Sequence, residues 1–388
     1  MRVLYVNHTG QVSGAERSLL DLLGGSRAEL DACLACPLAG PLASAARRLG
    51  IPVAPIVGTE GSLKLNLIHT PRALAAMSGA AIQVAWHARA WGADVLHANS
   101  IRAGLIAIGG GRASGRPVVV HLRDRLPRGR VADATLKVVD RGAAAVIANS
   151  RYTAEGFRLA GAHRDPIVIP NPVDLNRFDP ESIDRDRARS ALGLSSANLA
   201  LGVIGQITPW KGQADAVEAL ALLADQQPEA RLYLVGEAKF VSTATRYDNR
   251  AYLAEVERRI DQARLRDRIQ LLGEREDIPA ILRALDILLV PSWEEPFGRV
   301  VVEGMAMGLG VIATSVGGPS EVVTDGVDGL LLAPRNPDLW AAATARLASD
   351  RALLSRIGAR AMQAARAFGL GEHVAAVRSV YGRLSGMD

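Results

Sequence analysis

Two glutamates flank a glycine in the stretch PSWEEPFGRVVVEGMAMGLGVIAT, residues 291–314. The apolar run before this stretch predicts a buried strand, followed by a loop that contains Glu295 and a helix that begins near Phe297 or Gly298. Free backbone N–H groups and the helix dipole favour an anion at such a start, and glycine lets the backbone approach that anion closely. Glu303, one turn into the helix, can accept hydrogen bonds from the two hydroxyls of a ribose. The stretch therefore predicts a site for a phosphorylated nucleoside, although acids are favoured at any helix start.

A second loop, GVIGQITPWKG at residues 202–212, follows another apolar strand and places Lys211 at the opening of the next helix. The ammonium group of a lysine is a compact charge that suits a diphosphate. A lone lysine beside a glycine is more often an ordinary surface residue. The loop therefore supports the site at residues 291–314 and does not establish a phosphate site by itself.

The apolar strand PVVVH ends in His121. Ligands of open α/β sheets bind beyond the carboxyl ends of the strands, so His121 is a candidate for contact with a substrate. The alternative is a structural histidine whose ring nitrogens are satisfied by the backbone near the strand end.

Four arginines follow His121 in the segment HLRDRLPRGR: Arg123, Arg125, Arg128 and Arg130. Residues 1–175 contain 20 Lys and Arg against 12 Asp and Glu, whereas residues 176–388 contain 25 against 28. This asymmetry predicts that the first half of the chain meets an anionic partner, such as a phosphate-bearing acceptor or an acidic membrane surface. A solvated loop without a binding role is the alternative. No nucleic-acid-binding module accompanies the basic residues.

The elements that position these residues alternate as strand, helix, strand, which is typical of βαβ units in a parallel sheet. A polar stretch after residue 176 interrupts the alternation, and a second series of strands then begins. Strands as apolar as these are buried on both faces and predict two doubly wound α/β domains. We expect the domains to span residues 1–176 and 177–371.

The composition predicts a soluble enzyme of the cytosol. Apolar residues make up 49% of the 388 residues, and no apolar run reaches the ~20 residues of a membrane span.

Cys33 and Cys36 lie three positions apart on an expected strand, where their side chains point to opposite faces, so we expect no disulfide or metal chemistry from them. The Asp-x-Asp spelling at Asp184 to Asp186 falls in the polar linker and not after a strand. We therefore expect no metal and no cofactor.

Together the motifs resemble glycosyltransferase family 4, over nearly the whole chain and in family order. The resemblance is carried by SGAE at residues 13–16, the strand end at His121, ANSRYT, IPNPVDLNRF, the Lys-Gly loop, LVGE, LLGEREDI, the paired-glutamate stretch and GGPSEVV. It implies the GT-B fold, in which two Rossmann-like domains face each other across a cleft. It also implies that the C-terminal helix, about residues 372–388, packs back on the first domain.

The resemblance further implies residue roles in the transfer of a hexose-type sugar from a nucleoside diphosphate, with retention of anomeric configuration. Glu303 would bind the donor ribose, Glu295 with the backbone of Pro296, Phe297 and Gly298 would position the donor sugar, and Lys211 with Gly205 would bind the diphosphate. Gly14 would face the donor phosphates or the acceptor, and His121 would lie beside the transferred sugar. The acceptor would be a sugar, a small molecule or a lipid-linked molecule met at the inner membrane face.

Two residues depart from the family pattern. Gln206 stands where many members have an arginine that shares the diphosphate, so Arg299 becomes the nearest candidate to replace its charge. Pro172, in NPVD, stands where a glycine is usual.

Glu276 could accept hydrogen bonds from guanine, which favours GDP over UDP as the donor nucleotide.

Two other functions remain open at this stage. A nucleotide-sugar epimerase would keep the donor loops without needing an acceptor, and a non-catalytic nucleotide-sugar-binding protein would be consistent with Gln206. An NAD-dependent oxidoreductase is disfavoured because no early G-x-G-x-x-G with a following acid is present.

Overall fold

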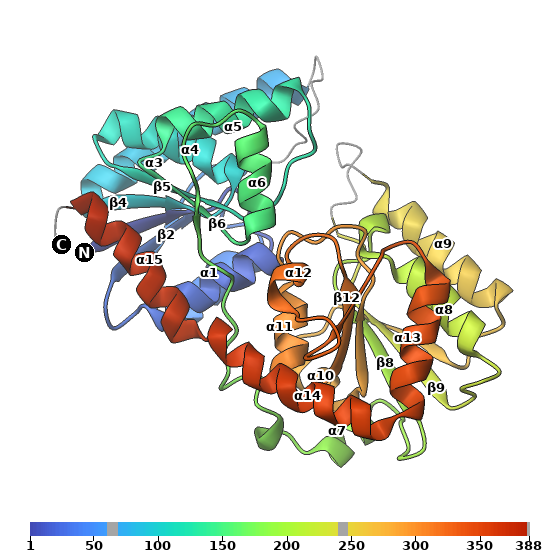
Figure 1. Ribbon diagram of the computed structural model, residues 1–388. Helices are drawn as coiled ribbons and strands as arrows, with labels where there is room; N and C mark the ends of the chain where they lie inside the picture. Colours follow the sequence, from blue (N-terminus) through green and yellow to red (C-terminus); the bar gives the residue numbers. More distant parts are fainter. Residues whose placement is uncertain (60–68, 240–246, 386–388) are drawn as a thin grey trace. The chain divides into compact units, whose positions relative to one another are not determined.

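The chain folds into two compact units, Met1–Pro172 with Leu370–Asp388, and Val173–Gly369 (Figure 1). The computed structural model describes residues 1–59, 69–239 and 247–385. The first unit ends at Pro172, slightly before the boundary expected at residue 176, because Val173 already bonds to the second unit through the carbonyl of Phe368 (2.8 Å).

Within those ranges the first unit contains a seven-stranded parallel sheet in the order β3-β2-β1-β4-β5-β6-β7. Its strands are β1 (Arg2–Val6), β2 (Asp31–Cys36), β3 (Val53–Pro55), β4 (Val95–Ala98), β5 (Val118–Leu122), β6 (Ala145–Ala148) and β7 (Ile167–Val168). Its helices are α1 (Gly14–Gly25), α2 (Pro41–Arg48), α3 (His69–Trp91), α4 (Ile101–Ser114), α5 (Arg130–Gly142), α6 (Arg151–Leu159) and α15 (Leu370–Ser385).

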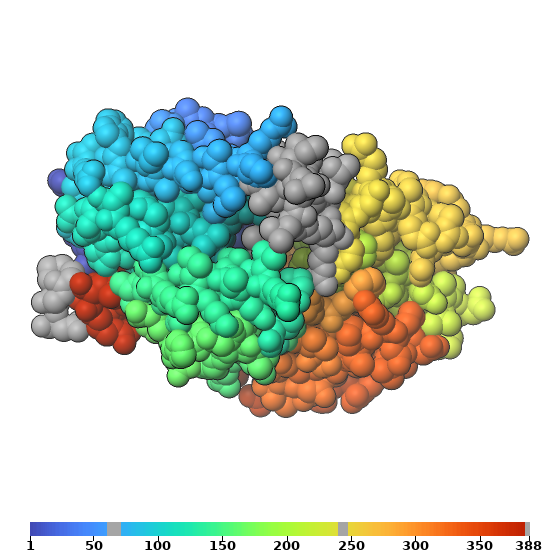
Figure 2. Space-filling model, turned by 90° about the horizontal axis from the view of Figure 1, so that it is seen from above, coloured from blue at the N-terminus to red at the C-terminus, as the bar shows by residue number. Residues whose placement is uncertain are grey.

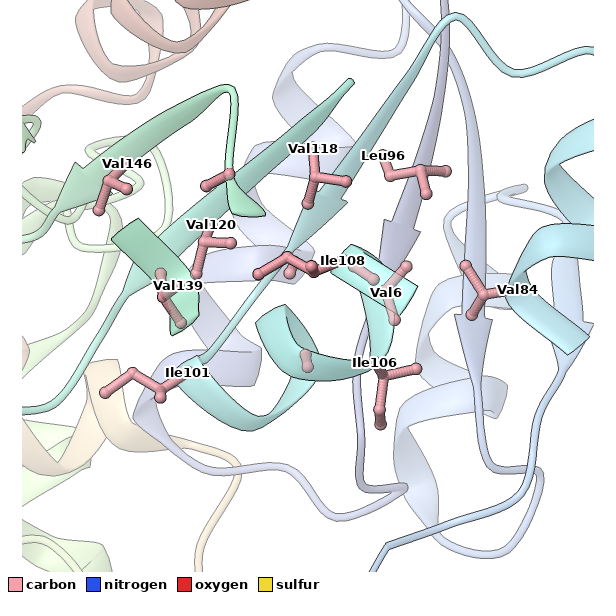
Figure 3. Close-up of a cluster of buried hydrophobic side chains, with 14 of the residues drawn as sticks. Val6, Val84, Leu96, Ile101, Ile106, Ile108, Val118, Val120, Val139 and Val146 are labelled. Carbon is pink, nitrogen blue, oxygen red and sulfur yellow. The ribbon is translucent and has the colours of Figure 1, made fainter. Parts of the chain in front are cut away.

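Helices cover both faces of this sheet, as the apolar strands predict. One face packs against α3, α4, α5 and α6, and Figure 3 shows how side chains from strands and helices meet there. The labelled members of this cluster are Val6, Val84, Leu96, Ile101, Ile106, Ile108, Val118, Val120, Val139 and Val146. The other face packs against α1, α2 and α15.

The same capping device follows β4 and β6. Ser100 accepts a hydrogen bond from the N–H of Ala103 (3.1 Å), and Ser150 accepts one from the N–H of Thr153 (3.0 Å), so each serine satisfies a free donor at the start of a helix. Both serines follow an Ala-Asn pair at a strand end. The device fixes two helix starts at the carboxyl edge of the sheet.

The second unit contains, in its described residues, a six-stranded parallel sheet in the order β10-β9-β8-β11-β12-β13. Its strands are β8 (Leu199–Ile204), β9 (Ala230–Val235), β10 (Ile269–Gly273), β11 (Ile287–Val290), β12 (Gly310–Thr314) and β13 (Leu330–Leu332). Its helices are α7 (Arg185–Ala191), α8 (Gln213–Leu223), α9 (Asn249–Gln262), α10 (Ile278–Ala284), α11 (Arg299–Ala306), α12 (Pro319–Val322), α13 (Pro337–Ser349) and α14 (Arg351–Ala365), with short 3₁₀ turns at Pro180–Ser182, Pro209–Lys211 and Arg366–Phe368. Two doubly wound α/β units are therefore present, as predicted.

The Asp-x-Asp spelling caps a helix. Asp184 is the N-cap of α7, and its carboxylate accepts a hydrogen bond from the N–H of Arg187 (3.1 Å). Asp186 lies in the first turn of α7, where a negative charge interacts favourably with the helix dipole. The pattern thus has a structural explanation.

Helix α15 returns to the first unit and completes its core. Its side chains are buried against the face of the sheet that α1 and α2 also cover: Val374, Val377, Val380 and Tyr381. Tyr381 also hydrogen-bonds Nδ1 of His97, on β4, at 2.5 Å. The helix spans Leu370–Ser385, close to the range expected from the sequence.

Two histidines of the sheet lie fully buried beneath α15. The ring centroids of His97 and His121 are 5.5 Å apart, and that of His121 is 6.3 Å from the ring of His373 on α15. Burial, with a smaller contribution from the Arg123 charge, lowers the pKa of His97 and of His121 well below the ordinary value. Both rings are therefore neutral in the folded chain.

These neutral rings predict that acid destabilises the first unit. The unfolded chain takes up protons near pH 6.5 while the folded rings do not, so the free energy of unfolding falls as the pH drops below that value. His121→Gln should reduce this dependence by up to about 1.4 kcal/mol per pH unit. Urea unfolding at a series of pH values between neutral and mildly acidic measures it. The exposed His163→Gln is the control, and equal slopes for both variants would contradict the prediction.

Candidate functional site

The loop between β11 and α11 is held by backbone hydrogen bonds to loops on both sides. The N–H of Trp293 donates to the carbonyl of Trp210 (2.7 Å), which lies in the loop after β8. On the other side, the N–H of Gly318 donates to the carbonyl of Glu295 (2.8 Å), and the N–H of Glu295 donates to the carbonyl of Val316 (3.2 Å). Segments that follow β8, β11 and β12 therefore meet at the carboxyl edge of the sheet, where α/β proteins bind ligands.

Glycines make this close approach possible. A Cβ on Gly317, whose φ is +103°, would lie 2.1 Å from the carbonyl oxygen of Glu295. A Cβ on Gly212, with φ +72°, would lie 2.1 Å from the carbonyl oxygen of Pro291. Both positions also have backbone conformations that residues with side chains rarely adopt. The position of Glu295 thus depends on glycines in neighbouring loops.

Glu295 is held by two side chains through one of its carboxylate oxygens. Its Oε2 pairs with Nζ of Lys211 and accepts a hydrogen bond from Oγ of Ser292 (3.1 Å). The side chains of Lys211 and Glu295 are 17% and 8% exposed. The other oxygen, Oε1, has no hydrogen-bond partner among the described residues. The two residues that the sequence assigned to phosphate and sugar are thus already together.

Helix α11 begins as predicted, with Gly298 at its N-cap in the left-handed conformation (φ +86°). Nε of Arg299 donates to Oε1 of Glu303 at 2.7 Å, and both side chains are at most 10% exposed. In the part of the chain that the structure describes, Oε2 of Glu303 has no hydrogen-bond partner. Arg299, the candidate for a second cation at the diphosphate, thus pairs with the expected ribose ligand, and its contact with a diphosphate stays a prediction.

Gly205 and Gln206 form the turn after β8. A Cβ on Gly205 would lie 3.7 Å from Cε of Lys211, so the lysine side chain passes over this glycine. The side-chain amide of Gln206 donates to the backbone carbonyl of Lys239 (3.1 Å), and the backbone carbonyl of Gln206 accepts from the side chain of Gln213 (2.9 Å). Gln206 therefore ties the loop after β8 to the loop after β9.

Three other residues that were predicted for the site are not bonded to its charged side chains. Phe297 is buried (4% exposed), and its ring lies 6.2 Å from that of Phe368, so its side chain belongs to the core. Glu276 is exposed, and its backbone carbonyl accepts a hydrogen bond from Arg177 (3.2 Å). Pro296 is partly exposed between Glu295 and Phe297.

The residues that hold the loop between β11 and α11 were not predicted from the sequence. Ser292 lies three positions before Glu295, a spacing that could have indicated a hydrogen bond within the loop. Trp293 Nε1 donates to Oδ2 of Asp215 (3.0 Å) on α8, and burial raises the pKa of that carboxyl group. Gly317 belongs to the motif GGPSEVV, but no pattern in the neighbouring sequence indicates its contact with Glu295.

The predicted residues of the first unit differ more from expectation. His121 is fully buried (0% exposed) beside the ring of His373 on α15, and neither of its ring nitrogens has a hydrogen-bond partner among the described residues. The backbone therefore does not satisfy the ring, and contact of His121 with a ligand stays a prediction. Gly14 opens α1, and a Cβ there would meet nothing within 4 Å. The neighbouring Ser13 and Glu16 form a capping box, with the N–H of Ser13 donating to Glu16 at 3.1 Å, which explains the SGAE spelling structurally.

The four arginines after β5 do not form one exposed patch. Arg123 is buried (3% exposed) and donates to Oδ1 of Asn99 (3.2 Å) and to Asn171, so its expected surface role is wrong. Arg125 stacks on Tyr152 and pairs with Glu155 (3.1 Å). The remaining two are Arg128, which pairs with Asp133 (3.4 Å), and Arg130, which begins α5.

Two family models match the chain, one for each unit. Residues 12–177 match Glycosyltransferase Family 4, and residues 184–364 match Glycosyl transferases group 1. The solved structure of HepE from Anabaena in complex with UDP-glucose is 28% identical, with a TM-score of 0.85 over 99% of this chain and 100% of that one. The likeness extends over both units.

The curated relatives that resemble this chain are also glycosyltransferases by name. A D-inositol 3-phosphate glycosyltransferase of Xylanimonas cellulosilytica is 35% identical over 66% of this chain and 60% of its own length. A D-inositol 3-phosphate glycosyltransferase 2 of Catenulispora acidiphila is 30% identical over 84% of this chain and 74% of its own length. The chain spans from about half to two thirds of the length of several such relatives. The chain belongs to glycosyltransferase family 4, with the GT-B fold.

Proposed function

We propose that this chain is a retaining glycosyltransferase that moves a sugar from a nucleoside diphosphate to a hydroxyl group of an acceptor. One observation carries most weight: beside the left-handed Gly298, two nearly buried carboxylates are each held by a cation through a single oxygen. Buried charges are rarely kept unless they are paired or functional. Their place at the carboxyl edge of the sheet supports a nucleotide-sugar site.

The donor roles follow from the chemistry of each group. The ammonium of Lys211 and the N-terminal N–H groups of α11 would neutralise the diphosphate. Glu303 would offer Oε2 to a ribose hydroxyl, and Glu295 would offer Oε1 to a hydroxyl of the sugar. When the diphosphate binds, Lys211 can divide its three donors between Glu295 and the phosphate oxygens.

Retention would proceed on one face of the sugar. The bond from the anomeric carbon to the diphosphate oxygen breaks, the acceptor oxygen bonds to the same face, and its proton passes to the departing phosphate. Glu295 is paired with Lys211 and hydrogen-bonded by Ser292, which suits a group that positions the sugar better than a nucleophile. This arrangement differs from retaining glycosidases, in which a free carboxylate attacks.

We favour a uridine nucleotide in the donor, because the HepE neighbour was solved with UDP-glucose and with UDP. The only support for GDP is Glu276, an exposed residue. A thermal-shift comparison of UDP and GDP decides between them, since a ligand that binds only the folded chain raises its melting temperature.

The acceptor is proposed to carry a phosphate or another anionic group, in view of the basic first half of the chain. Arg130, an exposed residue at the start of α5, remains available for this role, whereas Arg123 is buried, and Arg125 and Arg128 are each paired with an acid within the unit. No described helix has the length and apolar character of a membrane span. The enzyme would meet a soluble or lipid-linked acceptor from the cytoplasmic side.

Removal of either donor-site charge should weaken nucleotide binding. Glu303→Ala and Lys211→Ala should each lower affinity for the matching nucleoside diphosphate by roughly 1.5 to 3 kcal/mol, the range of charge-assisted hydrogen bonds. Titration calorimetry measures the change. Glu257→Ala and Lys137→Ala remove exposed charges of the same kind and should bind like the wild type. Wild-type affinity in both site variants would contradict the assignment of nucleotide binding to this site.

The contact between Gly317 and Glu295 can be tested with a matched pair of glycines. Gly317→Ala should displace Glu295 and reduce turnover at least tenfold, because its Cβ would overlap the Glu295 carbonyl. Gly326→Ala also introduces a side chain at positive φ (+74°), but there the space is open, so it should cost only about 1 kcal/mol of stability and leave turnover unchanged. Equal losses would show that backbone conformation, and not the contact, is responsible.

Transfer should continue when divalent metal is chelated, because Lys211 and the start of α11 supply the positive charge for the diphosphate. Product formation is measured with radiolabelled nucleotide sugar, with and without EDTA. Loss of activity that magnesium or manganese restores would show that a metal neutralises the diphosphate. The same assay distinguishes transfer from epimerisation and from binding without product.

A further inference from the structure

Helix α3 presents large apolar side chains to solvent. Ile82 is 72% exposed, Trp86 is 65% exposed and Leu74 is 58% exposed. Ile82 and Trp86 are one helical turn apart, so they form a continuous apolar ridge. A tryptophan is usually well buried in a folded domain, and adjacent exposed apolar residues indicate a contact surface more often than a lone one does.

The opposite side of α3 is an ordinary core face. Ala80, Val84 and Ala88 are fully buried there, against α4 and the sheet. In Figure 2 the light-blue helix α3 and the adjoining α4 lie side by side on the visible surface of the first unit. The ridge is therefore additional to the side chains that attach α3 to its unit.

The helix that carries the ridge and its neighbour α4 are basic. Helices α3 and α4 contain Arg72, Arg89, Arg102 and Arg112 and no Asp or Glu. Arg89 donates to the carbonyl of Ala113, which brings its guanidinium to the last turn of α4, the turn that contains Arg112. Among the described residues, Arg72, Arg89 and Arg112 have no carboxylate within salt-bridge distance. Arg125 and Arg128, by contrast, are each paired with an acid.

We infer that the ridge of Ile82 and Trp86, with Arg89 and Arg112, docks on an anionic lipid surface. Exposed Trp and Ile insert at the boundary between headgroups and acyl chains, while arginines beside them meet lipid phosphates. A second copy of the chain fits less well, because a twofold interface on this ridge would bring the same arginines against each other. The inference does not depend on the proposed transferase activity.

Vesicle flotation tests this docking. Wild-type protein should float with phosphatidylcholine vesicles that contain phosphatidylglycerol and much less with phosphatidylcholine alone. Arg89→Ser with Arg112→Ser should weaken binding roughly thirtyfold, from about 1 kcal/mol per basic residue, and the loss should shrink as salt is added. Ile82→Ser with Trp86→Ser should weaken binding at least tenfold at every salt concentration.

A matched control removes two exposed apolar residues from other surfaces, Leu159→Ser with Leu222→Ser, whose side chains are 47% and 48% exposed. This variant should bind vesicles like the wild type. Melting temperatures of all variants show whether they are folded, which is expected because every substituted side chain faces solvent. Failure of the wild type to float, or equal binding by the control and the Ile82/Trp86 variant, would overturn the inference. So would concentration-dependent dimers, measured by sedimentation, that the Ile82/Trp86 variant abolishes.

Discussion

The candidate site depends on how closely the backbone at Glu295 approaches Gly317 and Gly318. The distance is so short that a single methyl group at either glycine would overlap the backbone of residues 295–297. Because the carbonyl and N–H of Glu295 are both bonded to that neighbouring segment, the carboxylate starts from a fixed point. Lys211 and the start of α11 are arranged around it. A flexible loop with the same side chains would have to order them at a cost in entropy each time a ligand bound.

The charges of the site are balanced in pairs, and this has an energetic reason. Glu295 and Glu303 are nearly buried, so an unpaired carboxylate at either position would cost several kcal/mol. Each is paired with a cation, Lys211 or Arg299, through one oxygen only. The second oxygen keeps its capacity to accept a hydrogen bond. Pairing therefore offsets the cost of burying each carboxylate while it leaves an acceptor for a polyhydroxylated ligand.

Sequence reasoning reached the features that are local in the chain. The strand-loop-helix around Gly298, the placement of Lys211 and the two α/β units follow from apolar periodicity and helix-start chemistry, which depend on neighbouring residues. The contact of Gly317 with Glu295 was not predicted because it joins separate loops. The pairing of Arg299 with Glu303 was not predicted either, although the two residues are four positions apart on one helix, a spacing at which side chains meet. The burial of His121 and of Arg123 was not predicted. Both lie at a strand end, but α15, distant in sequence, helps to bury the sheet face of His121, and Arg123 is held by Asn99 and Asn171.

The return of α15 to the first unit also has a consequence for how the chain folds during synthesis. A ribosome that has made all of the first sheet has not yet made Val377, Val380 and Tyr381, which cover one face of it. The whole second unit, Val173–Gly369, emerges before them and can complete its own core. Until α15 emerges, the side chains it covers at His97 and Tyr5 lack their contacts with Tyr381. The unit that begins first along the chain is thus the one whose core is completed last, and one apolar face of its sheet stays uncovered by α15 until then.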